Sequence, residues 1–408
     1  MTDATARTGT TPYRWLVLLL SWAAFTMTSV DRATWGPASA SVGESWAVPI
    51  AALGTFATAY YIGYVLSNLG GGFLVDWVGG RAVISVSGVG AGAAMILFGA
   101  TTSLPAGLAI QAVIGLLAGV DFAAGLKLLA TWFAPDRRGF AVGIFMTATS
   151  LGTVVANAVV PSLIRAAGWE SAYLTFGIVT IVIALACGLF LRNGAVAPVG
   201  PARPSRTRPD VRPLLRNRDL LLLGLTGFGA LWGSSGVVTW SNTLMVKGHG
   251  VDPVEAGVVL VLYAGIAIGI KPIVGSIVDR LGIGLRRPTV AVLGFFGGTL
   301  LLFGTLTDST QFLWVAPLVG IGAAAYSPLI TAMIPLLAGT RVAGSAAGAV
   351  NAFWQLGSVA VPTVVGVVYA ATDGSFTAAF ATLALGPIVG AVLAVFIREP
   401  RDVPADRR

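Results

Sequence analysis

Five ionisable side chains lie within long apolar stretches of the sequence: Asp31, Arg32, Asp121, Lys127 and Lys271. An ionisable residue among apolar neighbours is costly unless it has a partner, so each one indicates a functional site. With all five ionised, three positive charges stand against two negative ones. A cavity that collects them would attract an anion and repel cations. We therefore expect Arg32, Lys127 and Lys271 to bind an anion, and Asp31 or Asp121 to carry a proton.

The spacing of these residues excludes pairing along a single helix. Adjacent residues such as Asp31 and Arg32 point about 100° apart on a helix. Asp121 and Lys127 are six residues apart, which places them about 240° apart around the helix axis. Each group therefore needs a partner on another helix, or faces a ligand. One economical arrangement pairs Asp31 with Lys127 across a central cavity and leaves Arg32 for the substrate.

Lys271 is the only one of the five in the second half of the chain, and Pro272 follows it. The proline frees a backbone carbonyl one turn earlier and can kink a helix. An anion held by both Arg32 and Lys271 would bridge the two halves and favour their closure around it. The alternative is that Lys271 extends its ammonium to the membrane interface.

Uncharged polar residues in the apolar stretches are further candidates for contacts with the anion. Amides and phenols in such segments need hydrogen-bonding partners, which are either ligands or neighbouring helices. The candidates are Tyr60, Tyr64, Asn242, Asn351 and Gln355.

The composition indicates the elements that must position these residues. Of the 408 residues, 56% are hydrophobic and 10% are charged, whereas soluble proteins carry about 25% charged residues. The mean hydropathy is +0.85. A membrane-spanning helix needs about 20 apolar residues, and the apolar runs are too long and continuous for the strands of a β-barrel. We predict an all-α membrane protein with helices near residues 13–38, 47–75, 82–101, 105–133, 138–165, 169–191, 219–246, 253–278, 288–307, 310–337, 342–371 and 374–397.

The distribution of basic residues predicts the orientation. The two chain termini and the loops on their side of the membrane hold 20 of the 25 lysines and arginines. Only Arg165 and Lys247 fall on the other side. Because basic loops stay in the cytoplasm, we expect a multi-pass protein of the cell (plasma or inner) membrane with both termini cytoplasmic. The same distribution explains the net charge of +8 without a nucleic-acid partner.

A proline- and arginine-rich segment divides the chain. It separates six predicted spans from six, so we expect an N-terminal bundle at 1–192, a cytoplasmic linker at 193–218 and a C-terminal bundle at 219–408. The chain has one cysteine and one histidine, which argues against a metal site and excludes an intramolecular disulfide. No phosphate-binding loop of the G-x-x-x-x-G-K-[ST] type is present. We expect no cofactor, and no nucleophile–base arrangement supports an enzyme.

The two halves contain a related short motif. "GGFLVDWVGG" (71–80) and "GSIVDRLGIG" (275–284) share a glycine, an aspartate four residues later and a glycine three further on. The spacing resembles the G-x-L-x-D-R-x-G-R-R loop motif of the major facilitator superfamily. Trp77 and Gly80 replace two basic residues of that motif. The resemblance implies twelve transmembrane helices in two pseudo-symmetric six-helix bundles, a monomer, and a gating role for Gly72, Asp76, Gly79, Arg81, Asp279 and Arg280.

A second resemblance narrows the function. "VDRATWGPA" is similar to the Y-x-D-R-x-x-L-x first-helix motif of the anion:cation symporters, which include sugar-acid carriers. It implies that Arg32 binds a carboxylate and that Asp31 takes part in proton coupling. Lys127 stands five residues before Trp132-Phe133, as a basic residue does in that family. The chain departs from it at Gln111 and Ala118, where a superfamily arginine and the family's glutamate would fall.

Three functions remain open at this point. The first is proton-coupled symport of a small organic anion, a monocarboxylate or sugar acid, by alternating access. The second is anion exchange, because a basic residue at Lys271 also resembles the oxalate–formate exchangers and monocarboxylate carriers. The third is efflux of a drug or metabolite by proton antiport.

Overall fold

The computed structural model describes residues 12–133, 135–194, 217–281, 284–338 and 343–398, and these residues form twelve α-helices. The first six are α1 (Tyr13–Ser45), α2 (Ile50–Val78), α3 (Gly80–Ala100), α4 (Leu104–Trp132), α5 (Pro135–Ala167) and α6 (Trp169–Phe190). The other six are α8 (Arg218–His249), α9 (Pro253–Leu281), α10 (Arg286–Phe303), α11 (Ser309–Ala338), α12 (Ala343–Ala371) and α13 (Phe376–Val395). No strand occurs in the described ranges, so the prediction of an all-α chain is confirmed.

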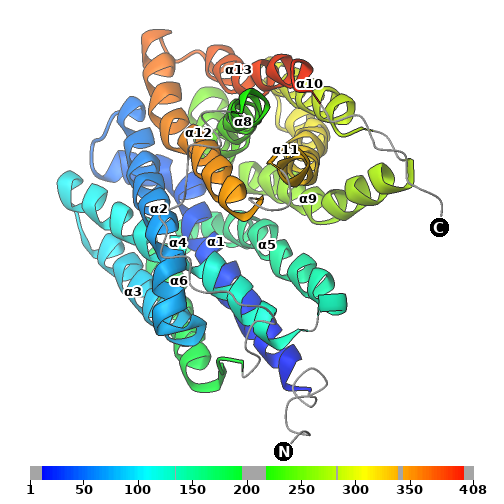
Figure 1. The fold of residues 1–408 in the computed structure, drawn as a ribbon. Coiled ribbons are helices and arrows are strands. Elements are labelled where there is room, and N and C mark those ends of the chain that lie inside the picture. Colours follow the sequence, from blue (N-terminus) through cyan, green and yellow to red (C-terminus); the bar gives the residue numbers. More distant parts are fainter. Residues whose placement is uncertain (1–11, 134, 195–216, 282–283, 339–342, 399–408) are drawn as a thin grey trace, which may run out of the picture.

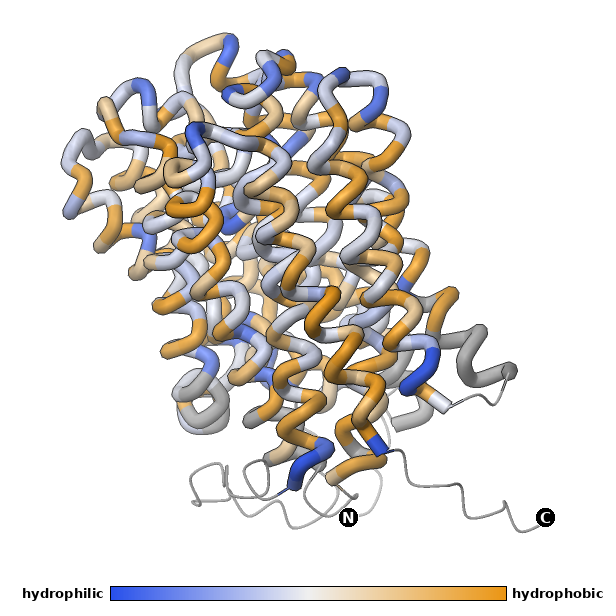
Figure 2. The backbone as a smooth tube through the Cα atoms, turned by 90° about the horizontal axis from the view of Figure 1, so that it is seen from above, coloured by the Kyte–Doolittle hydropathy of each residue, from blue (hydrophilic) through white to orange (hydrophobic). Residues whose placement is uncertain are grey.

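Most of these helices suit a bilayer. Eleven of them are long and apolar enough to cross a membrane. Helix α10 is the exception, since it has 18 residues and begins with Arg286 and Arg287. Along the bundle, hydrophilic residues gather at the two ends of the helices and hydrophobic residues predominate between them (Figure 2).

The helices form two groups, with α1–α6 on one side and α8–α13 on the other (Figure 1). We call these the N-terminal group and the C-terminal group. Within the N-terminal group, glycines let helices pack closely. A Cβ atom at Gly115 of α4 would overlap the backbone oxygen of Tyr60 in α2. This close approach sets the position of the α2 segment that carries Tyr60 and Tyr61.

The two groups meet at one end of the molecule, which we call the contact end. There Thr58 of α2 donates a hydrogen bond to the Val359 carbonyl at 2.9 Å, and Ser39 of α1 is hydrogen-bonded to Thr243 of α8. A Cβ atom at Gly54 would overlap the Pro362 carbonyl oxygen. Glycine is therefore required where α2 approaches α12.

Two ion pairs also join the groups at the contact end. Arg165 at the end of α5 binds Asp252 before α9, with nitrogen and oxygen 2.7 Å apart. Lys247 of α8 binds Glu44 of α1. The hydrogen bonds and ion pairs named here between the two groups lie at this end. At the opposite end, which we call the terminal end, lie Tyr13 and Arg398, the first helical residue and the last described one.

Candidate anion site

Arg32 lies near the middle of α1, on the side that faces the C-terminal group. It lines a pocket together with Trp35, Gly36, Ala57, Tyr60, Tyr61, Gln111, Val238 and Thr239. Helices α1, α2, α4 and α8 therefore all contribute, so both groups form the pocket. The Nε atom of Arg32 is buried and has no hydrogen-bond partner among the described residues. An unsatisfied guanidinium beside a pocket is suited to binding an anion.

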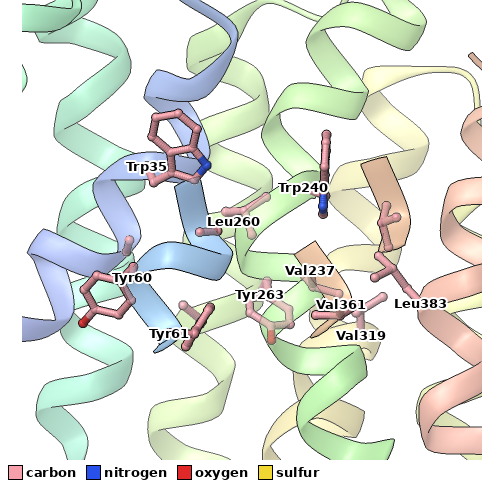
Figure 3. Packing of buried hydrophobic residues seen from close by; sticks show 14 of the residues in the cluster. Trp35, Tyr60, Tyr61, Val237, Trp240, Leu260, Tyr263, Val319, Val361 and Leu383 are labelled. Carbon is pink, nitrogen blue, oxygen red and sulfur yellow. The ribbon is translucent and has the colours of Figure 1, made fainter. Parts of the chain in front are cut away.

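Aromatic side chains surround Arg32. Its positive charge acts on the phenols of Tyr60, Tyr61 and Tyr64 from α2, and on Tyr263 from α9. Figure 3 shows Tyr61 and Tyr263 next to each other, one from each group, with Tyr60 and Trp35 nearby. The Tyr60 hydroxyl is buried and has no partner in the described part of the chain. The pocket therefore combines one cation, aromatic walls and an unused hydroxyl.

Asp31 faces away from this pocket. Its Oδ1 atom accepts a hydrogen bond from the Thr180 hydroxyl of α6 at 3.1 Å. Its side chain is only 4% exposed, and its Oδ2 atom has no partner among the described residues. Asp31 and Arg32 thus point toward different neighbours, as the angle between adjacent helical residues predicts.

Asp121 lies inside the N-terminal group and both of its oxygens are hydrogen-bonded. Thr28 of α1 donates to Oδ2 and Ser87 of α3 donates to Oδ1, each at 2.6 Å. The carboxylate therefore links three helices, and this position favours a structural role.

Lys127 does not meet Asp31. Its Nζ atom donates to the Val75 carbonyl of α2 at 2.8 Å, while Asp31 accepts only from Thr180. The prediction of an Asp31–Lys127 pair is therefore wrong for this conformation. The reason is that Lys127 lies near the terminal end of α4, about six turns after Leu104, where its side chain reaches the last turns of α2.

Lys271 is the anion ligand that the sequence predicts from the C-terminal group. It is partly buried on α9, about two turns beyond Tyr263. It is not among the residues that line the pocket around Arg32. Neither cation has a hydrogen bond or ion pair among the described residues. The role of Lys271 as a ligand of the anion therefore stays a prediction.

The other predicted ligands divide between two places. Tyr60 lines the pocket, and Tyr64 stacks on it with ring centroids 6.1 Å apart. Asn242 instead donates to Asn157 of α5 at 2.7 Å, so it belongs to the contact between the groups. Asn351 and Gln355 are partly exposed on α12 and do not line the pocket.

Sequence reasoning missed Trp35, Thr239 and Tyr263. Tyr263 is the single tyrosine of α9, and a lone phenol in an apolar segment is the signal that points to it. Trp35 lies about one helical turn after Asp31 and Arg32 on α1. This spacing is the sequence signal that could have identified it.

Residues 20–362 match the family model of the Major Facilitator Superfamily. The protein belongs to this superfamily. Its fold agrees, because the chain superposes with a TM-score of 0.78 on a bacterial homologue of the human lysosomal transporter Spinster in an inward-facing, unoccupied conformation. The two share 15% sequence identity over 95% of this chain and 96% of that one. The protein is accordingly a membrane transporter of this superfamily and not an enzyme.

Curated relatives of similar length include carriers of sugar acids. A probable galactarate/D-glucarate transporter of Bacillus subtilis is 24% identical, over 90% of this chain and 88% of the relative. A D-galactonate transporter of Escherichia coli is 23% identical, over 93% and 94% of the two chains. The resemblance to sugar-acid carriers of this superfamily is therefore confirmed.

The superfamily loop motif lies at the terminal end of α2. Gly79 ends this helix with a φ of 94°, a backbone conformation that favours glycine. Arg81 donates to the Gly188 carbonyl of α6 from Nε at 2.9 Å and from its terminal nitrogen at 2.6 Å. In this conformation Arg81 joins α3 to α6 within one group and does not bridge the groups. The remaining predicted gating residues lie outside the described side chains: Gly72, Asp76, Asp279 and Arg280.

Proposed function

We propose that this protein carries a small organic anion, a monocarboxylate or sugar acid, across the cell membrane by proton-coupled symport. The observation that supports this most directly is Arg32, which lines a pocket formed by both groups and whose buried Nε atom has no described partner. The names of the two relatives, which are sugar-acid transporters, agree with this class of substrate.

Arg32 is suited to hold a carboxylate. A guanidinium can donate two parallel hydrogen bonds to the two oxygens of one carboxylate. The rings of Trp35, Tyr60 and Tyr61 give the pocket largely apolar walls, and charge–charge attraction is stronger in apolar surroundings than in bulk water. No described protein group accepts a hydrogen bond from the Arg32 guanidinium. A bound carboxylate would therefore supply the missing acceptors.

The contacts between the two groups at the contact end define which side of the carrier is closed. The basic residues of the termini and linker favour a cytoplasmic position for the terminal end. The groups then touch on the extracellular side, which corresponds to an inward-facing state. Transport requires the contacts at Asn157–Asn242 and Arg165–Asp252 to separate while the terminal end closes. An anion bound by residues of both groups favours that closure.

Asp31 is the better candidate for the proton carrier. One of its oxygens is buried without a described partner, whereas both oxygens of Asp121 accept hydrogen bonds. Asp31 is also the sequence neighbour of Arg32, so its charge acts on the site that holds the anion. Protonation of Asp31 removes a negative charge next to Arg32 and strengthens binding of the anion.

The test is uptake into proteoliposomes of radiolabelled organic acids, with and without an inward proton gradient. Wild type should accumulate one or more acids only with the gradient. Asp31→Asn should abolish accumulation and retain counterflow exchange, and Arg32→Ala should abolish both. Asp121→Asn is the matched control, and it should keep gradient-driven accumulation. Loss of counterflow in Asp31→Asn would contradict the assignment.

The second candidate is anion exchange without protons. The observation that favours it is that Arg32 and Lys271 are both cations without described partners, so they need no proton to bind an anion. Wild-type exchange that is indifferent to pH, with no accumulation on a proton gradient, would establish this reading.

A further inference from the structure

The pocket around Arg32 carries one charge and is otherwise walled mainly by rings. Among the described residues that line it, Arg32 alone is charged. Three aromatic side chains line the same pocket, Trp35 from α1 and Tyr60 and Tyr61 from α2. The remaining lining residues are small or aliphatic except for an amide and a hydroxyl: Gly36, Ala57, Val238, Gln111 and Thr239. The pocket therefore suits a ligand with one anionic group and a largely apolar body.

The polar side chains of α8 on either side of the pocket are already bound to other protein groups. One turn before the lining residues, the Ser235 hydroxyl is hydrogen-bonded to Ser358 of α12 at 2.6 Å. One turn after them, Asn242 donates to Asn157 of α5. A sugar acid has a hydroxyl on nearly every carbon, and each hydroxyl that is buried without a partner costs free energy. These walls therefore offer few partners to a sugar.

We propose that the pocket selects an aromatic monocarboxylate in preference to a polyhydroxylated sugar acid. This inference rests on the proposed function and narrows its substrate class. The carboxylate binds the Arg32 guanidinium, and the ring of the substrate lies against the rings of Trp35 and Tyr61. Aromatic rings attract one another in offset-stacked and edge-to-face arrangements, in addition to the gain from burying apolar surface. This attraction distinguishes an aromatic acid from a saturated acid of similar size.

The aromatic walls are held in place by their own packing. Trp35 stacks on Phe56, with ring centroids 4.7 Å apart and planes at 28°. Tyr60 meets Tyr61 edge to face, with centroids 5.5 Å apart and planes at 87°. Tyr263 of α9 stands next to Tyr61 from the other helix group (Figure 3). Because these rings are already ordered, little conformational entropy is lost when a substrate ring binds between them.

The experiment compares radiolabelled monocarboxylates in proteoliposomes: benzoate with cyclohexanecarboxylate, phenylacetate with cyclohexylacetate, and all four with galactonate. Uptake by Arg32→Ala proteoliposomes is subtracted, since protonated aromatic acids also cross bilayers unaided. In wild type, the aromatic member of at least one pair should be taken up at least about tenfold better than galactonate and about fivefold better than its saturated partner.

Substitutions of Trp35 test the source of this preference. Trp35→Leu should remove the advantage of the aromatic acid over its saturated partner, because it replaces a ring with an aliphatic side chain. Trp35→Phe should retain most of the advantage. Trp314→Leu is the matched control, since Trp314 lies on α11 outside the pocket and is 78% exposed. It should leave the ratio of the two acids unchanged.

The outcomes separate this inference from the proposed function. Wild-type uptake of galactonate that equals or exceeds that of both aromatic acids, with loss of uptake in Arg32→Ala, overturns the aromatic preference and leaves the anion carrier standing. Equal uptake of the aromatic and saturated members of both pairs overturns it as well. If folded wild type transports none of these acids or other organic anions, the proposed function fails too. The wild-type comparison needs no Trp35 variant, so misfolding of Trp35→Leu cannot obscure the result.

Discussion

Asn242 of α8 donates a hydrogen bond to Asn157 of α5 at 2.7 Å, and this buried pair joins the two helix groups. The sequence predicts Asn242 as a substrate ligand. In the structure Asn242 does not line the pocket around Arg32 and lies nearer the contact end. Ser39–Thr243 lies beside it. These neutral polar contacts suit a joint that must open repeatedly, because each contributes only about 1 kcal/mol of net free energy.

Asn242→Ala should shift the protein toward the state in which the contact end is open. A neutral hydrogen bond contributes about 1 kcal/mol, which corresponds to about a fivefold change in the ratio of the two states. The measurement is the rate of maleimide labelling of Thr58→Cys in a Cys187→Ser background. Asn351→Ala removes an asparagine that takes no part in these contacts and is the control. Equal labelling in both variants would contradict a role of Asn242 in the joint.

Arg32→Lys should retain the charge at the site and still lose most of the transport. A lysine cannot donate two parallel hydrogen bonds to one carboxylate, so uptake at low substrate should fall at least about tenfold. The thermal stability of Arg32→Ala without substrate should not fall, since the variant removes a cation whose buried Nε atom has no described partner. A marked loss of thermal stability would instead indicate that Arg32 is a structural residue.

The pH dependence of transport should not come from Asp252. Hydrogen bonding by the Val254 amide, followed by the Arg165 charge, lowers the pKa of Asp252 below its ordinary value of 3.8. A lowered pKa means that the carboxylate stays ionised above about pH 4, and that the pair with Arg165 weakens only as the pH falls through this pKa. Asp252→Asn should therefore keep the shape of the wild-type uptake profile between about pH 5 and pH 8, whereas Asp31→Asn should flatten it. A changed profile in Asp252→Asn would assign the titration to the contact end.

Gly115→Ala should destabilise the N-terminal group. The new methyl would overlap the Tyr60 carbonyl oxygen, and overpacking of this kind costs about 1–3 kcal/mol. Since separation of α2 from α4 also displaces Tyr60 and Tyr61, uptake should fall together with thermal stability in detergent. Gly70→Ala on α2 is the control, because a Cβ atom there meets nothing within 4 Å. An unchanged melting temperature for Gly115→Ala would contradict this packing.

Much of the fold can be predicted from the chain alone. Long apolar runs separated by charged turns define the helices, and the predicted limits agree with α1 to α13 to within a few residues at most ends. Helix α10 forms as predicted but is not apolar enough to count as a membrane span, because Arg286 and Arg287 shorten its apolar stretch. The duplicated Gly–Asp–Gly motif and the "VDR" sequence are local patterns, so they indicate the superfamily and the importance of Arg32 without any tertiary information.

The tertiary structure decided which way each buried group faces. Helical periodicity gives the angle between Asp31 and Arg32, but the rotation of α1 about its own axis depends on packing against α6 and the C-terminal group. The sequence therefore could not show that Asp31 meets Thr180, that Lys127 meets the Val75 carbonyl, or that Asn242 meets Asn157. These partners are more than 50 residues apart in the chain, and only the packing of whole helices brings them together.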